Sequence, residues 1–502
     1  MKTLISLFLL SALATPASAK PFRYAEDRAP AIAHPAYATT MAEVRLNELI
    51  FEGLFTDADD LSSDPCLALS AELAPDKKSV TIELRPSVSW HDGKEFSSAD
   101  VVFTISAMKA QASGSPEAAR VKFIKSAQAL GPLKLLLTFH KPEYAPEDKL
   151  HFKILPAHAF ESTTLSRADN FRNRPIGTGP WKLQSFNDDN SITLQRFDDY
   201  WSRSSLESVT MREVADRSYQ SKLLMYESLE GLVRVLPRDL APLKADRNID
   251  LYPYQTNSWW YIGFNQSNAH LGQPEVRRAI GHLVDVPALL SPVGTGDLIS
   301  GPYVPSSPYY NHDVKPPKLD PQEAASLLGS VGYTKTDAGW SKDGEPLTLR
   351  IVTLKNLETA QDVILNLRSQ LERQGIKVET KFLTRPEWKE RVWAQRDFDL
   401  VLSTWTFDRN EDIYQQFHSK GSRNFGNFAN EDVDRLLDQA RNATDPQEKK
   451  LALREAHARI AEDAPMVFLW TPDSYAAMSR KVKGVLVHPF SFFTFAREWS
   501  LR

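Results

Sequence analysis

A capped amphipathic helix that stops at a glycine and runs straight into a strand narrows the fold class of this chain. Residues 359–374 carry an apolar stripe from Val363 to Leu371, Gly375 ends the helix, and residues 376–382 continue as a strand. Helices that alternate with strands in this way cover the faces of a sheet. The sequence therefore predicts an α/β protein.

The same alternation of short strands and capped helices runs along the whole chain. Residues 79–85 and 191–197 have the period-two pattern of half-buried strands, and Ser97 with Asp100 forms a capping box. The chain has 502 residues, whereas single hydrophobic cores stop growing at about 250–300 residues. We therefore expect two or three domains.

The N-terminus has the layout of a secretory signal. Lys2 gives a positive start, residues 4–13 are an apolar run, and the small residues 17–19 form a cleavage site before Lys20. The apolar run is shorter than the ~20 residues that span a membrane. Cys66 lies far from the cleavage point, so it cannot carry the lipid of a lipoprotein. We expect a signal peptide at residues 1–19 and a periplasmic protein.

Charge and sequence motifs argue against several classes of function. The net charge of −4 gives no reason to expect a nucleic acid partner. The sequence has no Gly-x-Ser-x-Gly elbow, no His-Glu-x-x-His zinc helix and no phosphate-binding P-loop. Its 11 histidines are scattered and its single cysteine cannot build a metal cluster. We expect no catalytic residues, no metal and no cofactor, and favour a binding protein over an enzyme.

One stretch resembles a known family. Residues 81–102 (TIELRPSVSWHDGKEFSSADVV) are similar to the strand–turn–helix signature of family 5 extracellular solute-binding proteins, the oligopeptide- and dipeptide-type receptors of ABC importers. About ten motifs follow the family's order along nearly the whole mature chain, which makes chance a poor explanation. They include residues 49–54 (LIFEGL), 154–156 (ILP), 176–183 (IGTGPWKL), 199–201 (DYW), 264–265 (FN), 276–279 (VRRA), 331–333 (VGY), Trp405 with Asp408, and 430–437 (NEDVDRLL).

The resemblance implies a type II periplasmic-binding fold with two hinged lobes and an extra domain inserted in the first lobe. The implied first lobe comprises residues 20–50, 177–264 and 472–502, the extra domain residues 51–176, and the second lobe residues 265–471. We therefore expect the protein to be a monomer that captures a peptide or another amine-bearing solute between its closing lobes. It delivers this ligand to a membrane ABC permease, without catalysis.

The resemblance also implies an aspartate that contacts the ligand. Residues 399–402 have the pattern of a buried strand, and ligands of α/β proteins gather at strand ends. Asp408 follows at the position where peptide-binding members pair with the ligand's α-ammonium, a charge-assisted hydrogen bond that gains strength in a closed cleft. The alternative is a helix cap, because Glu411 lies three residues further on.

Three neighbours of this aspartate are further candidates. Trp405 is expected to form a flat wall of the pocket, with core packing as the alternative. Thr404 and Thr406 flank it, where the family uses backbone groups to hydrogen-bond an extended peptide as an added strand does.

Aromatic residues elsewhere complete the expected ligand-binding set. Trp388 matches a family position whose aromatic side chain often lines the cleft. Trp260 and Tyr261, together with Trp259, lie at the expected crossing between the lobes as hinge or pocket residues. Because side chains alternate along a strand, only some of these three can face the ligand.

Two departures from the family's pattern bear on specificity. Residues 359–362 (TAQD) contain no arginine, although dipeptide-type members grip the ligand's carboxylate from this region. Residues 409–411 (RNE) replace the usual tyrosine–proline pattern. A dipeptide clamp is therefore not expected. The alternatives are the same fold binding an oligosaccharide or another uncharged solute, since tryptophans suit sugar faces, and an exported hydrolase with motifs of another kind.

Overall fold

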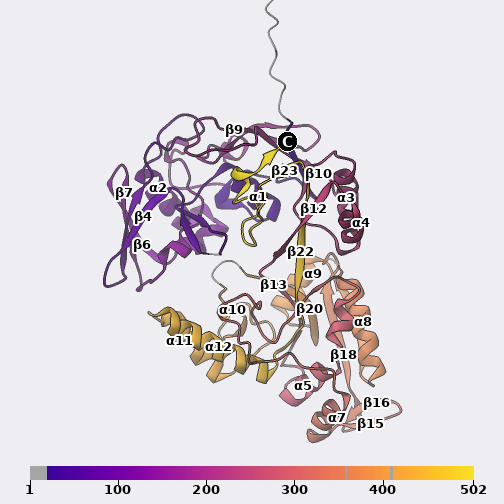
Figure 1. The fold of residues 1–502 in the computed structure, drawn as a ribbon. Helices are drawn as coiled ribbons and strands as arrows, with labels where there is room; N and C mark the ends of the chain where they lie inside the picture. The colour runs from indigo at the N-terminus through magenta and orange to yellow at the C-terminus, as the bar shows by residue number, and fades with distance from the viewer. Residues whose placement is uncertain (1–19, 61, 358, 408–410) are drawn as a thin grey trace, which may run out of the picture.

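The computed structural model describes residues 20–60, 62–357, 359–407 and 411–502. The expected signal peptide, residues 1–19, and the predicted ligand partner Asp408 lie outside these ranges. The described chain is a mixed α/β protein with two lobes, one built around the N- and C-terminal segments and the other around the orange segments of Figure 1. The α/β class predicted from the sequence is confirmed.

The first lobe is built on an eight-stranded sheet. Its order is β12-β22-β11-β1-β10-β9-β8, with β14 paired to β22. The elements of this lobe are β1 (Phe22–Glu26), α1 (Met41–Ile50), β8 (Trp181–Phe186), β9 (Ile192–Arg196), β10 (Ser208–Glu213), α3 (Arg217–Met225), β11 (Gly231–Leu232), α4 (Leu240–Ala245), β12 (Ile249–Gln255), β14 (Gly296–Leu298), β22 (Trp470–Ser479), β23 (Val482–Lys483) and β24 (Ser500–Leu501).

A separate antiparallel sheet occupies the region expected to hold the extra domain. It has the order β4-β5-β7-β6 and lies beside α2, at the left of Figure 1. The predicted capping box is confirmed, because the Ser97 backbone N–H donates to Asp100 Oδ2 over 2.9 Å. The elements are β2 (Phe55–Asp57), β3 (Ser63–Pro65), β4 (Ala68–Leu73), β5 (Ser79–Leu84), α2 (Ser98–Lys109), β6 (Ile124–Gly131) and β7 (Lys134–Phe139).

The second lobe is built on a five-stranded sheet of order β19-β18-β20-β13-β21. Helices α5 and α8 pack on one face of this sheet, and α11 and α12 pack on the other. The elements are β13 (Ser258–Phe264), α5 (Pro274–Leu283), α6 (Val286–Leu290), α7 (Pro321–Ser330), β15 (Thr334–Thr336), β16 (Gly339–Lys342), β17 (Glu345–Pro346), β18 (Thr348–Leu354), α8 (Ala360–Arg373), β19 (Lys377–Leu383), α9 (Arg385–Trp388), β20 (Leu400–Thr406), α10 (Tyr414–Phe417), α11 (Glu431–Asn442), α12 (Pro446–Asp463) and β21 (Met466–Phe468).

The expected first lobe ended at residue 264 and so included β13, but the structure places this strand in the second lobe. This strand pairs with β20 and β21 and belongs to the five-stranded sheet. Its apolar run is buried on both faces of that sheet, which a strand covered by helices requires. The chain therefore changes sheets between β12 and β13, at residues 256 and 257, and changes back near Leu469, between β21 and β22.

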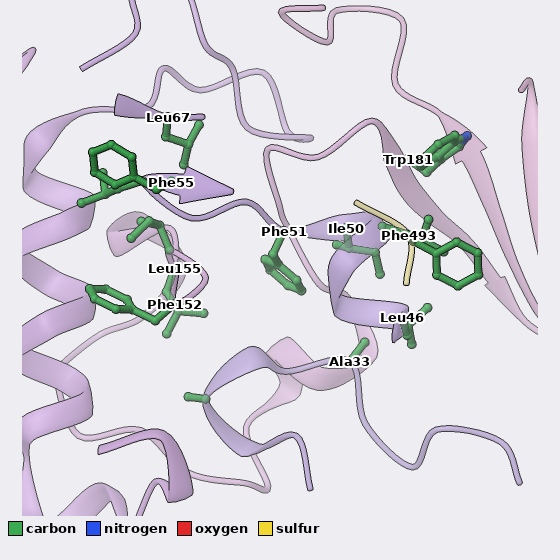
Figure 2. Close-up of a cluster of buried hydrophobic side chains, with 14 of the residues drawn as sticks. Ala33, Leu46, Ile50, Phe51, Phe55, Leu67, Phe152, Leu155, Trp181 and Phe493 are labelled. Carbon is green, nitrogen blue, oxygen red and sulfur yellow. The ribbon is translucent and has the colours of Figure 1, made fainter. Parts of the chain in front are cut away.

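The C-terminal end of α1 is fixed in a core shared by the first lobe and the extra domain. Figure 2 shows Ile50 and Phe51 among Phe152, Trp181 and Phe493. This packing fixes the direction in which the preceding turn of α1 presents its side chains.

The backbone after α1 also approaches a glycine-containing loop closely. The Gly179 N–H donates to the Ile50 carbonyl over 2.9 Å, and a Cβ on Gly177 would lie 1.8 Å from that same oxygen. The Gly-Thr-Gly sequence is thus required by close backbone contact. Within the described ranges, no helix has the length and apolar character needed to cross a membrane.

Candidate ligand-binding site

A cavity of about 750 Å³ lies between the two lobes. Its volume falls within the range of about 300–1,000 Å³ that is typical of small-ligand sites. The first lobe, the extra domain and the second lobe all contribute to its wall. The residues used below are Glu26, Arg45, Asn47, Glu48, Asp57, Lys153, Asn257, Ser258, Trp260, Leu357, Thr404, Thr406, Phe407 and Trp470.

The second-lobe wall is formed by one face of the β13–β20 pair. Trp260 stands opposite Thr404, and Ser258 stands opposite Thr406. Residues directly opposite in an antiparallel pair project from the same face of the sheet. All four line the cavity, so the structure brings together three of the predicted site residues, Trp260, Thr404 and Thr406.

The backbone groups of Thr404 and Thr406 point away from β13. The Phe407 N–H donates to the Asn257 carbonyl over 2.7 Å, so residues 407, 405 and 403 are the hydrogen-bonded positions of this antiparallel pair. The intervening Thr404 and Thr406 direct their N–H and C=O groups to the other edge of β20.

On that edge the ladder between β18 and β20 ends early. Its last register pair is Val352 with Val401, and the Thr353 hydroxyl then donates to the Leu402 carbonyl over 2.9 Å. Beyond this point β18 leaves β20, and Leu357, which follows β18, lines the cavity. The end of β20 therefore has a strand partner on one side and the cavity on the other.

Three other predicted site residues are not on the cavity wall. Trp405 and Tyr261 occupy the alternate positions of the same strands and lie on the opposite face of the sheet. The Trp405 ring is half-buried there, with the Arg423 guanidinium 5.3 Å from its centroid. Trp388, at the end of α9, packs in the hydrophobic core of the second lobe. These three side chains, for which ligand contact was predicted, therefore do not line the cavity.

Tyr261 is held as a core residue by burial and by one polar contact. Burial raises the pKa of its hydroxyl, and a hydrogen bond with the Ser403 side chain acts in the opposite direction. Trp259 shares this face and packs against Tyr261, with ring centroids 5.1 Å apart. Of the three aromatic residues expected at the crossing between the lobes, Trp260 is the one that lines the cavity.

The first-lobe wall carries charged side chains. Arg45 of α1 makes two bonds to Glu26 of β1, from Nε to Oε1 and from Nη2 to Oε2, each 2.6 Å long. Burial alone would lower the pKa of Arg45, but the bonds to Glu26 and its charge raise that pKa above its usual value. Arg45 and Glu26 thus form a bidentate, charge-assisted ion pair in which the two charges neutralise each other.

Two polar side chains of α1 beside this pair lack partners for some of their atoms. Glu48 Oε2 accepts a hydrogen bond from the Phe493 N–H over 2.8 Å, whereas its buried Oε1 receives none from the residues that the structure describes. Asn47 is 3% exposed, and neither its Oδ1 nor its Nδ2 has a partner within the described chain. Burial raises the pKa of Glu48 to about 7, against the Phe493 N–H and the charges of Lys153 and Arg45.

A carboxylate with two histidines lies further along the same wall. Asp57 Oδ1 is 3.4 Å from His151 Nδ1, and Asp57 Oδ2 is 3.6 Å from His488 Nδ1. The His488 Nδ1 also accepts a hydrogen bond from the Phe490 N–H over 3.2 Å. In the part of the chain that the structure describes, no group of three or more His, Cys, Asp or Glu side chains is arranged to hold a metal ion.

Most residues of the wall were missed by the sequence interpretation, and Asn47, Glu48, Phe407 and Trp470 are among them. The signal for the first two is a polar pair that interrupts the apolar residues Leu46 and Leu49 in a short helix. A buried polar pair in such a helix needs a partner outside the helix. For Trp470, the sequence contains no local signal.

Comparisons with known proteins agree with this architecture. A profile described as "Bacterial extracellular solute-binding proteins, family 5 Middle" matches residues 64–427. The oligopeptide-binding protein AppA of Bacillus subtilis is 25% identical over 480 residues, 92% of this chain and 88% of AppA. The glutathione-binding protein GsiB of Shigella boydii is 24% identical over 463 residues, 89% of this chain and 88% of GsiB.

Two solved structures share the fold over almost the whole chain. NikZ from Campylobacter jejuni in complex with Ni(L-His) matches with a TM-score of 0.81 and 24% identity, over 96% of this chain and 99% of NikZ. AppA from Bacillus subtilis in complex with a nonapeptide matches with a TM-score of 0.79 and 24% identity, with the same coverage. The type II periplasmic-binding fold expected from the sequence is confirmed.

Proposed function

Because the chain belongs to the bacterial extracellular solute-binding proteins of family 5, we propose that it captures a peptide or another amine-bearing solute between its lobes and delivers it to an ABC permease. Capture and delivery of the solute depend on binding alone, without catalysis. Ligand burial and lobe closure favour one conformation of the receptor over others, and this needs no chemical step. We also propose that residues 1–19 direct export to the periplasm and that the mature receptor acts as a monomer.

The observation that carries the peptide proposal is the end of β20. Thr404 and Thr406 direct backbone donors and acceptors toward the side where β18 no longer pairs with β20. An extended peptide bonds to such an edge as an additional strand, and its own alternate N–H and C=O groups match the spacing. A sugar or a metal complex has no such repeat of donors and acceptors.

The relatives support the same ligand class. AppA is named for oligopeptides and has been solved with a nonapeptide, and GsiB is named for glutathione. All three of these ligands contain amide bonds. For this chain we propose that Asp408, which follows Phe407 of the cavity wall in the sequence, pairs with the ligand's ammonium group.

The test is ligand-induced stabilisation of the mature protein, residues 20–502. Melting temperature is measured with peptides of two to nine residues, with the same peptides N-acetylated, with oligosaccharides and with the nickel–histidine complex. We expect free peptides to raise the melting temperature in proportion to the logarithm of their concentration and N-acetylated peptides to raise it less. Native mass spectrometry of the purified receptor identifies retained ligand.

A variant tests the contribution of the ligand's amine separately from that of the rest of the ligand. Asp408→Asn is expected to weaken binding of free peptides and leave binding of N-acetylated peptides unchanged, because a carboxylate bonds an ammonium more strongly than an amide does. Stabilisation by oligosaccharides or by nickel–histidine, with no response to any peptide, would overturn the proposed function.

A further inference from the structure

We propose that Asn47 and Glu48 form a subsite on the first-lobe wall that binds a second positively charged group of the ligand, such as a lysine or arginine side chain. This deepens the proposed function and rests on it. The subsite is separate from Asp408 in sequence and belongs to the other lobe. The ligand class that it selects is a peptide with a basic side chain.

The first argument is the set of unused hydrogen-bonding atoms. Within the described residues, no donor bonds to the buried acceptors Glu48 Oε1 and Asn47 Oδ1, and both residues line the cavity. Leaving such a group without a partner destabilises the protein, and more so when the group is charged. An ammonium or guanidinium group brings several N–H donors in a small volume and satisfies both acceptors together.

The second argument is local charge. The groups that face Glu48 are Arg45 on its own helix, Lys153 and Asp57 of the extra domain, and the Tyr24 hydroxyl of β1. Arg45 is neutralised by its two bonds to Glu26, and Asp57 lies beside His151 and His488, so Lys153 is the remaining cation that acts on Glu48. Within the described residues Glu48 forms no ion pair, so its ionised carboxylate favours a cationic group of the ligand.

The third argument is rigidity. α1 begins at a capping box between Thr40 and Glu43 and ends in the packed core around Ile50. The Phe493 N–H holds Glu48 Oε2, so Oε1 is the oxygen left for a ligand. A subsite whose atoms are held in place before binding loses little entropy when the ligand arrives.

The subsite has a consequence for pH dependence. Because burial holds the pKa of Glu48 at about 7 in the empty cavity, a bound cation must favour the ionised carboxylate and release a proton. The affinity for a basic peptide is therefore expected to fall as the pH drops, by up to about 25-fold between pH 7.5 and pH 5.5.

The experiment compares matched ligands by isothermal titration calorimetry. The probes are trialanine and its three analogues with one lysine, measured at pH 7.5 and pH 5.5 on the mature wild-type protein, Glu48→Gln and Glu372→Gln. Glu372→Gln removes the same charge from α8, outside the cavity wall. Glutamine at position 48 keeps an acceptor for the Phe493 N–H, so we expect this variant to fold.

The expected result is a lysine preference of about tenfold or more in the wild type for at least one analogue, as a charge-assisted bond implies. Glu48→Gln loses this preference and its pH dependence, and Glu372→Gln behaves as the wild type. Equal binding of all four peptides, or a preference that survives Glu48→Gln, overturns the subsite alone. Failure of every peptide to bind overturns the proposed function and the subsite with it.

If Glu48→Gln fails to fold, the wild-type titrations still decide the question. Titrations at pH 7 in buffers with different ionisation enthalpies measure the protons released per lysine peptide bound. We expect about half a proton at this pH, because half of the Glu48 carboxyls are ionised beforehand. Equal proton release for trialanine and for the lysine analogues contradicts the subsite.

Discussion

Trp260 and Trp470 stack at the junction of the two lobes, with their ring centroids 5.6 Å apart and their ring planes at 23°. Trp260 belongs to β13 and Trp470 begins β22, so the pair joins the two strands that follow the changes of sheet. The Leu469 N–H donates to the Trp260 carbonyl over 2.9 Å and fixes the strands beside the rings. The wall of the cavity and the junction between the lobes therefore share residues.

Replacement of Trp260 should weaken both ligand binding and the junction. We expect Trp260→Leu to lower the unfolding free energy by about 1–3 kcal/mol and peptide affinity several-fold, because stacking and aromatic wall are lost together. Thermal melting and calorimetric titration measure the two effects. The control is Trp393→Leu, since Trp393 is 52% exposed and lies outside the cavity wall. Unchanged affinity in Trp260→Leu would contradict a ligand-facing position.

The free edge of β20 gives a prediction that involves a single backbone donor. Thr406→Pro removes the N–H that points to the cavity and leaves the ladder with β13 intact, because position 406 does not donate to β13. We expect peptide affinity to fall about tenfold, the equivalent of one hydrogen bond. Thr406→Val keeps the N–H, loses only the hydroxyl, and is expected to bind peptides nearly as the wild type does. Equal affinities of the two variants would show that this donor is not used.

A second set of contacts joins the lobes away from the tryptophan pair. Lys141, after β7, donates from Nζ to Asn442 Oδ1 over 2.7 Å, and Lys77 donates from Nζ to the Thr444 carbonyl over 3.1 Å. They connect the four-stranded sheet with the end of α11 (Figure 1). Exposed contacts of this kind are worth about 0.2–1 kcal/mol each.

The double variant Lys77→Met/Lys141→Met should therefore favour more open lobes. We expect a larger radius of gyration without ligand by small-angle scattering, and a peptide affinity lower by a factor of about two to five. Lys335→Met, on β15 of the second lobe, serves as the charge control. If the double variant keeps the wild-type radius and affinity, these contacts do not bias closure.

Local patterns in the sequence predicted the helices and strands well. They predicted less completely which side chains face the cavity. The capping box at Ser97 and the helix stop at Gly375 depend on neighbouring residues, and both appear as expected. Whether Trp260 or Tyr261 faces the cavity depends instead on the register of β13 against β20, more than 130 residues away. Period two shows that they face opposite sides but does not show which side the ligand occupies.

The same limit explains why β13 was assigned to the first lobe and why Glu48 was missed. A strand that is buried on both faces fits any sheet covered by helices, so the sheet to which β13 belongs is decided by its partner strands. Helix periodicity places Glu48 away from Leu46 and Ile50, but its neighbours Lys153 and Phe493 lie far from it in the sequence. Contacts of this range leave no local pattern in a single sequence.

The loop that follows the extra domain provides a stability prediction. Gly177→Ala places a Cβ 1.8 Å from the Ile50 carbonyl oxygen, so the end of α1 or the loop must move. We expect a loss of at least about 1–3 kcal/mol in unfolding free energy and a lower melting temperature. Gly329→Ala is the matched control, because a Cβ there meets nothing within 4 Å and alanine favours the helix α7 by up to about 1 kcal/mol.

Two buried histidines predict that the protein loses stability in acid. Burial lowers the pKa of His34 and of His457 from 6.5 to about 4, and both side chains are 0% exposed. Between these pH values the unfolded chain binds more protons than the native protein, so stability falls as the pH drops from 6.5 toward 4. Each histidine accounts for up to about 3 kcal/mol of this loss.

Glu48 acts with the opposite sign over part of the same range. Its pKa is raised from 4.5 to about 7, so its contribution is present below pH 4.5 and is lost as the pH rises through 7. Urea unfolding between pH 4.5 and 7.5 measures the sum of these effects. We expect His457→Gln to have a shallower dependence on pH than the wild type, and His140→Gln, at an exposed position, to match the wild type. Identical slopes for all three proteins would mean that His457 takes up its proton without unfolding.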